Sequence, residues 1–290
     1  MRKRTIELSV LMCLLLILSL FLWKKYEQNQ MQNMIDVSDI KNVPIICLEP
    51  LEYIELPSQT DNGHALTCTG LCYDKIGQTW FIGNYGREKS DDKDFYPSIV
   101  NVSADFYEIN YTIPFDGGDQ VDIQGVAYDK ETSSLWYTNG EQVINCDPIT
   151  GEEISRFSIG DYSKYKANGI CLDSKDGTLW ILCRYKFLLH FSKDGTLIDK
   201  VICEYLDQDH ICMDDDGLLY ISIGADYQGE NNYVLCMDRE ANIQKLYQMK
   251  ESYAIEGIVL LDNRLYVVND GIYHESKIKK NYIQIYDIQK

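Results

Sequence analysis

Five segments of this 290-residue chain repeat one pattern, which limits the possible folds more than any other feature. In each segment a polar residue precedes a glycine, replaced once by histidine, and then come four mostly apolar positions, a turn and a second apolar run. The segments read TGLCYDKIGQTWFIGN, QGVAYDKETSSLWYTN, NGICLDSKDGTLWILCR, DHICMDDDGLLYISIG and EGIVLLDNRLYVVND. Short apolar runs joined by turn residues predict β-hairpins. The chain is therefore expected to be all-β.

The repeat has the period of a β-propeller blade. Its glycine or histidine position recurs every 41 to 55 residues, too far apart for leucine-rich or ankyrin-type repeats, at Gly70, Gly125, Gly169, His210 and Gly257. One or two more strand-like runs follow each hairpin, which gives the four short strands of a blade. We predict a five-bladed propeller. Six blades are the alternative, if residues 85–121 contain a further one.

A strand near the start of the chain is expected to close the ring. The last repeat supplies three strand-like runs, whereas an unmatched run, Leu51–Leu56, precedes the first repeat. Pairing Leu51–Leu56 with the last blade would remove the open sheet edge that a ring must avoid. The propeller is therefore expected to span residues 45–290.

The N-terminal segment has the character of a membrane anchor. Thr5–Trp23 is a nineteen-residue run with Glu7 as its single charge, which is long enough to span a bilayer core. A cleaved signal peptide is the alternative, but no small-x-small cleavage site follows. We predict a cytoplasmic tip and single-pass signal anchor over residues 1–23, a polar stalk over 24–44, and a propeller on the extracytoplasmic side of the cell membrane, since the basic residues before the span slightly outnumber those after it.

Charge and cysteine content restrict the partners. The chain has a net charge of −18, and this acidic surface would repel nucleic acid. Most of the ten cysteines lie at apolar positions in strand-like runs, so we interpret them as buried thiols and not as a disulfide framework. The expected partners are an unidentified small-molecule or protein ligand, with the propeller itself a monomer.

The residue before each repeat glycine is the main candidate for a functional site. Corresponding positions on the inner strands of a propeller lie at one height around the central tunnel. Five oxygen-bearing side chains form this ring, namely Thr69, Gln124, Asn168, Asp209 and Glu256. The second strand of each blade returns to the same face, and its end supplies further candidates for ligand binding: Asn84, Asn139, Arg184, Asp226, Asn269 and Asp270.

The chemistry of this ring suits a hard divalent cation. Two carboxylates and two amides, from Gln124, Asn168, Asp209 and Glu256, are oxygen ligands typical of Ca²⁺ and not of zinc. Two other interpretations stay open: a ligand site without metal, and turn residues with no function beyond the fold. The Asp-rich turns lack the full ligand series of an EF-hand and are predicted to be hairpin turns.

The hairpin EGIVLLDNRLYVVND resembles those of the bacterial SdiA-regulated, YjiK-like propeller group. This resemblance implies a compact propeller with a cation, calcium by expectation, near the central tunnel. NHL-like propellers are more distantly similar.

A second resemblance is to the six-bladed senescence-marker-protein and gluconolactonase group, where a Glu, two Asn and an Asp hold a divalent cation. ANGICLDSKDGTLW matches its Asn-Gly-Ile segment and carries over Asn168, whereas DHICMDDDGLLYIS carries over Asp209. This chain departs from the group because its Glu lies in the last blade and Gln124 replaces an Asn.

Three functions are compatible with these features. The leading one is a membrane-anchored propeller that binds a divalent cation and a small ligand at the tunnel mouth. The first alternative is a metal-dependent lactonase- or esterase-like hydrolase, in which Asp209 is the general base. The second alternative is a protein-interaction scaffold without a metal site.

Overall fold

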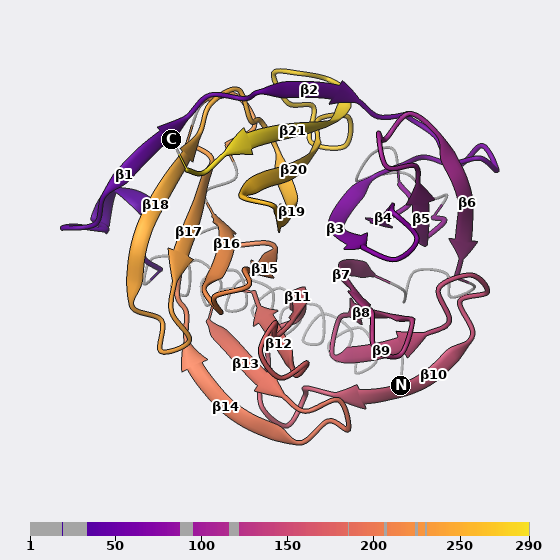
Figure 1. Ribbon diagram of the computed structural model, residues 1–290, viewed down its shortest axis with the longest axis horizontal. Coiled ribbons are helices and arrows are strands. Elements are labelled where there is room, and N and C mark those ends of the chain that lie inside the picture. Colours follow the sequence, from indigo (N-terminus) through magenta and orange to yellow (C-terminus); the bar gives the residue numbers. More distant parts are fainter. Residues whose placement is uncertain are drawn as a thin grey trace, which may run out of the picture.

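The computed structural model describes residue 19 and residues 34–87, 95–115, 122–184, 186–205, 208–223, 226–229 and 231–289. These residues form five sheets around a central axis, a five-bladed β-propeller (Figure 1). The predicted all-β, five-bladed fold is confirmed. The six-bladed alternative is wrong, because the described parts of residues 85–121 supply the two outer strands of the first blade.

Each blade contains four antiparallel strands, ordered from the axis to the rim. The first blade is β3 (Cys68–Asp74), β4 (Thr79–Asn84), β5 (Ser98–Val102) and β6 (Ile109–Pro114). The second is β7 (Ile123–Asp129), β8 (Ser134–Asn139), β9 (Gln142–Cys146) and β10 (Glu153–Ser158). The third is β11 (Ala167–Leu172), β12 (Leu179–Cys183), β13 (Phe187–Phe191) and β14 (Leu197–Ile202). The fourth is β15 (Ile211–Met213), β16 (Leu219–Ile223), β17 (Tyr233–Met237) and β18 (Ile243–Met249). The fifth is β19 (Ile255–Leu261), β20 (Arg264–Asp270), β21 (Asn281–Asp287) and β2 (Glu52–Glu55).

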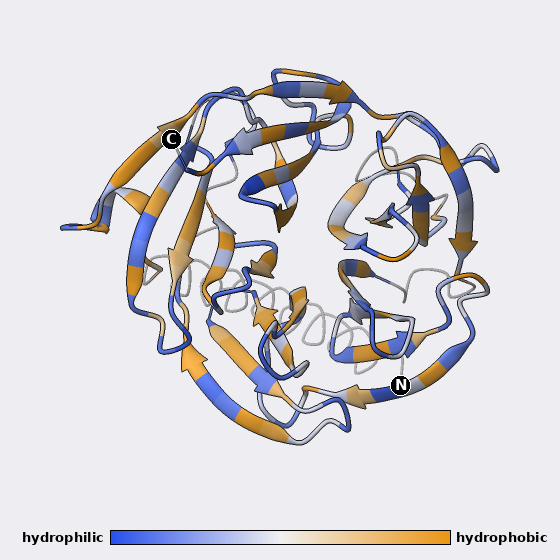
Figure 2. Ribbon diagram, viewed as in Figure 1, coloured by the Kyte–Doolittle hydropathy of each residue, from blue (hydrophilic) through white to orange (hydrophobic). Residues whose placement is uncertain are grey.

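Burial explains the hydropathy of each strand. The middle strands are covered on both faces by neighbouring blades, and all five residues of β12 are buried. Such two-sided burial favours continuous apolar runs over alternation. The rim strand β10 is exposed at most positions and mixes charged with apolar residues, and Figure 2 shows hydrophilic segments along the rim strands. The core therefore lies between blades, in five apolar clusters.

Glycine allows the inner strands of adjacent blades to approach closely. A Cβ atom at Gly70 would lie 2.5 Å from the carbonyl oxygen of Gln124, and one at Gly125 would lie 2.6 Å from that of Asn168. His210 occupies the equivalent position in the fourth blade, and its Nδ1 accepts a hydrogen bond from the Ile258 amide at 3.3 Å. One buried imidazole therefore fills the seam between the fourth and fifth blades.

Two strands from the start of the chain complete the outer rim. β2 pairs antiparallel with β21, so the predicted ring closure by Leu51–Leu56 is present. β1 (Ile45–Leu48) adds a fifth strand, parallel to β18, that the sequence did not predict. Farther upstream, the Ile35 amide donates to the Glu204 carbonyl at 2.7 Å. The segment from residue 34 to residue 55 thus crosses the rims of the third, fourth and fifth blades.

The predicted anchor concerns residues that, except for Ser19, lie outside the described part of the chain. Within the described part, no helix is long and apolar enough to cross a membrane. Of the predicted stalk, residues 34–44 are described, and three apolar side chains among them, Val37, Ile40 and Val43, pack against the core of the third and fourth blades.

The nine described cysteines are all free, and eight of them are buried. Several pack inside the apolar clusters between blades, such as Cys171 and Cys212. The interpretation of the cysteines as buried thiols is therefore confirmed for the described residues.

Candidate functional site

A polar cavity of about 320 Å³ opens at the end of the tunnel where the inner strands begin. Its wall includes all five side chains of the predicted ring: Thr69, Gln124, Asn168, Asp209 and Glu256. Two residues from the second strands of the third and fifth blades lie in the same wall: Arg184, which directly follows β12, and Asp270, which ends β20. The repeat analysis thus identified residues that the fold brings together from five blades.

Shifts in strand register leave several of these ring residues without a partner in the regular strand pairing. The pairing of β3 with β4 shifts register between Cys68 and Gly70, which leaves Thr69 without a ladder partner. The same shift occurs around Asn168 and around Glu256. A bulge re-aims a side chain that would otherwise point into the sheet face. The polar-Gly pair of the repeat is the sequence signature of this bulge.

The other strand-end residues stabilise the fold and lie outside the cavity wall. Asn84 and Asn269 are fully buried and bond inside their own blades, with Asn84 Oδ1 accepting from the Thr67 amide at 2.7 Å and Asn269 Oδ1 accepting from the Ser252 hydroxyl at 2.6 Å. Asn139 Oδ1 accepts from the Asp122 amide at 2.8 Å. Asp226 orders its own loop by accepting from the Gly229 amide at 2.7 Å.

Asp209 and Glu256 form a carboxyl pair across the seam between the fourth and fifth blades. Their side chains are hydrogen-bonded to each other, and Asn168 Nδ2 donates to Asp209 Oδ1 at 2.9 Å. Burial, followed by the charge of Glu256, raises the pKa of Asp209 well above its usual value. Burial raises the pKa of Glu256 to about 8, with Arg184 opposing the shift. Burial therefore favours the protonated form of both carboxyl groups.

A loop between β20 and β21 adds His274 to this pair. His274 Nε2 lies 2.9 Å from Glu256 Oε1, and its ring stacks on Tyr227 with centroids 4.2 Å apart. Burial lowers the pKa of His274, so the imidazole is uncharged at neutral pH. The loop is fixed to the fourth blade by a hydrogen bond from the Lys277 amide to the Tyr227 carbonyl at 2.8 Å.

Sequence reasoning missed several residues of the cavity wall, because they lie in loops outside the repeat. These include Tyr85, Asp122, Gln208, Tyr227, Tyr273 and His274. They share no sequence pattern, although Tyr273 and His274 lie three and four residues after the predicted Asp270.

Both ring amides present oxygen atoms to the cavity. Gln124 donates its NH₂ group to Asp122, and Asn168 donates to Asp209. Each amide nitrogen is therefore used by a neighbouring carboxylate, which leaves the carbonyl oxygen as the remaining acceptor. The cavity wall thus combines four carboxyl groups, from Asp122, Asp209, Glu256 and Asp270, with the two ring amides and Arg184.

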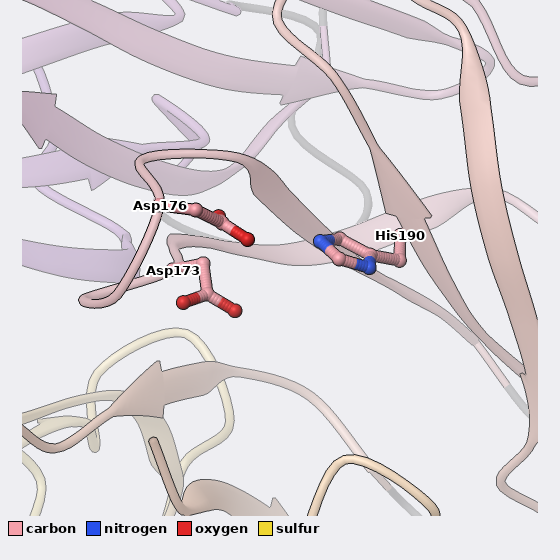
Figure 3. Close-up of side chains that lie close together, drawn as sticks. All are labelled: Asp173, Asp176 and His190. Atoms are coloured by element: carbon pink, nitrogen blue, oxygen red, sulfur yellow. The ribbon is translucent and has the colours of Figure 1, made fainter. Parts of the chain in front are cut away.

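A second cluster, Asp173, Asp176 and His190, lies at the other end of the third blade (Figure 3). Asp173 already accepts from Trp180 Nε1 at 2.9 Å and pairs with Arg239 at 2.5 Å. His190 lies 2.6 Å from the Thr178 hydroxyl and stacks on the Trp180 ring. The hydrogen bonds of this cluster hold Trp180 in place.

No protein-family model matches the sequence, and a search of curated proteins gave no match. Among solved structures, a glutaminyl cyclase from Myxococcus xanthus matches with a TM-score of 0.61 at 11% identity, over 85% of this chain and 99% of that chain. A gluconolactonase from Xanthomonas campestris matches with a TM-score of 0.48 at 10% identity, over 82% and 97% of the two chains.

The likeness shows the fold alone. The glutaminyl cyclase is a β-propeller, which agrees with the five sheets described above. The resemblance to the SdiA-regulated group stays a prediction, and so do the functions inferred from it.

Proposed function

We propose that this protein binds a divalent cation, with calcium the preferred ion, at the tunnel mouth through Gln124, Asn168, Asp209 and Glu256. The convergence of these oxygen ligands on one cavity supports the proposal. Ca²⁺ takes six to eight oxygen ligands at about 2.3–2.6 Å, and carboxylates and amide carbonyls are typical ones. A bound cation would offset the mutual repulsion of the Asp209 and Glu256 carboxylates.

In this proposal the propeller is a binding module. Residues 1–23 would anchor it in the cell membrane with the mouth cavity on the extracytoplasmic side. A cavity of about 320 Å³ is at the small end of the range for ligand pockets, so a small molecule could bind beside the cation.

Calcium should raise the melting temperature of the protein after chelator treatment. Binding to the folded state alone contributes about 2.7 kcal/mol at a hundredfold excess over the Kd, which corresponds to about 5–10 °C for a domain of this size. Differential scanning fluorimetry with EDTA and with calcium measures the shift, and Glu256→Gln should abolish most of it.

Asp176→Asn provides the matched control, because Asp176 belongs to the second acidic cluster and not to the mouth cavity. This variant should respond to calcium as the parent does. If the Asp176→Asn variant alone loses the response, the cation site is the second cluster. If millimolar calcium leaves the parent's melting curve unchanged, the ring does not bind calcium.

A second candidate function is hydrolysis or another acyl transfer with acid–base assistance. The contact between Glu256 and His274 supports it, since a carboxyl with a pKa of about 8 beside a neutral imidazole can exchange protons at neutral pH. Asp209 would act as the general base toward water, and the cation would polarise the substrate carbonyl. The fold is shared with a glutaminyl cyclase, so a peptide with N-terminal glutamine also belongs in a substrate panel.

Turnover of a lactone, an aryl ester or a glutaminyl peptide by the calcium-loaded protein would support this candidate. His274→Asn and Asp209→Asn should each lower kcat by about 10²-fold or more, the range for removal of a general acid or base. Absence of turnover with all three substrates at calcium saturation would leave the binding module as the function.

A further inference from the structure

Asp270 has an unsatisfied oxygen atom in the wall of the mouth cavity. The residue is 1% exposed, and it ends β20. Its Oδ1 accepts a hydrogen bond from the Tyr273 amide at 3.0 Å, whereas Oδ2 has no hydrogen-bond partner among the described residues. A buried carboxylate oxygen without a donor is costly, and burial accordingly raises the pKa of Asp270 to about 7; a donor supplied by a ligand would stabilise the ionised form.

An aromatic wall lies beside Asp270. Tyr273 contacts Tyr85 edge to face with centroids 5.8 Å apart, and it contacts His274 in the same manner at 5.0 Å. Tyr227 continues the wall by stacking on His274. All four rings line the mouth cavity. Tyrosine rings attract organic cations, with a free energy of about 0.5–2 kcal/mol.

The positively charged side chains near the aromatic wall do not exclude a cationic ligand. Arg87 lies 5.4 Å from the centroid of Tyr85, so this ring already contacts a guanidinium. Tyr273 is the tyrosine that both lines the cavity and follows Asp270 in the loop. Arg184 also lines the cavity, where its charge acts on Asp209 and Glu256.

We infer that Asp270 and Tyr273 form a subsite for the primary ammonium group of a small organic ligand. An ammonium group carries three N–H donors, one of which meets the Oδ2 atom of Asp270. A metal ion would need more oxygen ligands than this corner of the cavity offers. The inference rests on the mouth cavity being the binding site, as proposed above, but not on the identity of the cation held by Asp209 and Glu256.

The test compares n-propylammonium chloride with n-propanol, which has the same shape and no charge, by isothermal titration calorimetry in EDTA and again in calcium. The ammonium probe should bind at least about fivefold more tightly than the alcohol. Asp270→Asn should lower its affinity about tenfold or more, because a charge-assisted hydrogen bond contributes about 1.5–3 kcal/mol. Tyr273→Leu should lower it about two- to fivefold.

Asp176→Asn is the control, because Asp176 is a carboxylate of the second acidic cluster and lies outside the mouth cavity. Its affinity for the probe should equal that of the parent. Equal binding of propanol and propylammonium, or an unchanged affinity in Asp270→Asn, would overturn the subsite. Asp270→Asn keeps the acceptor for the Tyr273 amide, and a parent-like circular dichroism spectrum would verify its fold.

The two proposals fail separately. Ammonium binding in EDTA together with an unchanged melting curve in calcium would leave the subsite and remove the cation site. A calcium response without ammonium binding would do the reverse.

Discussion

Deletion of residues 45–57 should convert the protein from a folded propeller into aggregates. The deletion removes β1 and β2, and it leaves the edges of β18 and β21 unpaired on the rim. It also removes Ile54 and Leu56 from the core between the first and fifth blades. An unpaired strand edge beside exposed apolar surface is a template for intermolecular pairing. Size-exclusion chromatography and the melting curve measure the outcome.

Leu51→Ser is the matched control, because Leu51 belongs to the same segment but is 45% exposed. This variant should remain monomeric and melt close to the parent. A deletion variant that elutes as a monomer and melts like the parent would show that the N-terminal segment does not close the ring.

Without calcium, the protein should lose stability as the pH rises from about 5 to about 9. The folded state raises the pKa of Glu256 from 4.5 to about 8 and that of Asp270 from 3.8 to about 7. Between these values the folded protein binds more protons than the unfolded chain, so the free energy of unfolding falls with increasing pH. One pH unit corresponds to about 1.4 kcal/mol per group. Above pH 5 the shifts cover about three units for Glu256 and about two for Asp270, so a loss of about 7 kcal/mol and a fall of about 15–25 °C in melting temperature are expected.

Calcium should abolish or reverse this pH dependence, because it binds the ionised carboxylates. Glu256→Gln in EDTA should show a smaller loss between pH 5 and pH 9 than the parent, since the amide does not titrate. Melting curves of both proteins over this pH range provide the measurement. A parent protein in EDTA that is more stable at pH 9 than at pH 5 would contradict the raised pKa values.

The repeat predicted most of the fold because the same local requirements of strand approach and turn geometry recur in each blade. An inner strand must approach its neighbour closely, which selects glycine at positions such as Gly70 and Gly125. The hairpin turn that follows carries an Asp in every segment, as at Asp173, where Oδ1 accepts from the Lys175 amide at 2.8 Å. These local requirements recur in five segments, so they are visible in the sequence.

β1 was not predicted because it lies outside the repeat. It is a four-residue strand, and two of its residues are exposed. Its pairing depends on β18, a strand from the fourth blade some 200 residues later in the chain. A contact of this kind leaves no local signal of glycine, turn or alternation.

The candidate site likewise contains residues that the sequence predicted and residues that it did not. The ring from Thr69 to Glu256 was predictable because the start of each inner strand places one side chain per blade at the mouth, with a register shift at this point in four of the five blades. The prediction that Asn84, Asn139 and Asn269 bind a ligand stays untested. These three side chains lie outside the cavity wall, and their oxygen atoms accept hydrogen bonds from neighbouring amide or hydroxyl groups. An asparagine at a strand end serves backbone bonding as well as ligand binding, and sequence position does not separate the two. His274 reaches Glu256 through the fold of one loop, which no pattern specified.

The rim pairing of β2 with β21 has a consequence for the timing of synthesis. Glu55 on β2 bonds to Lys280, the residue just before β21, and 225 residues separate the two. At about 5–20 residues per second, the first of these partners waits about 10–45 s for the second to leave the ribosome. During this interval β2 has no native partner, because β21 has not yet been synthesised, even if the earlier blades have already folded. Closure is therefore the last step of folding, and any factor that shields residues 45–57 from other chains until translation ends should increase the yield of folded protein.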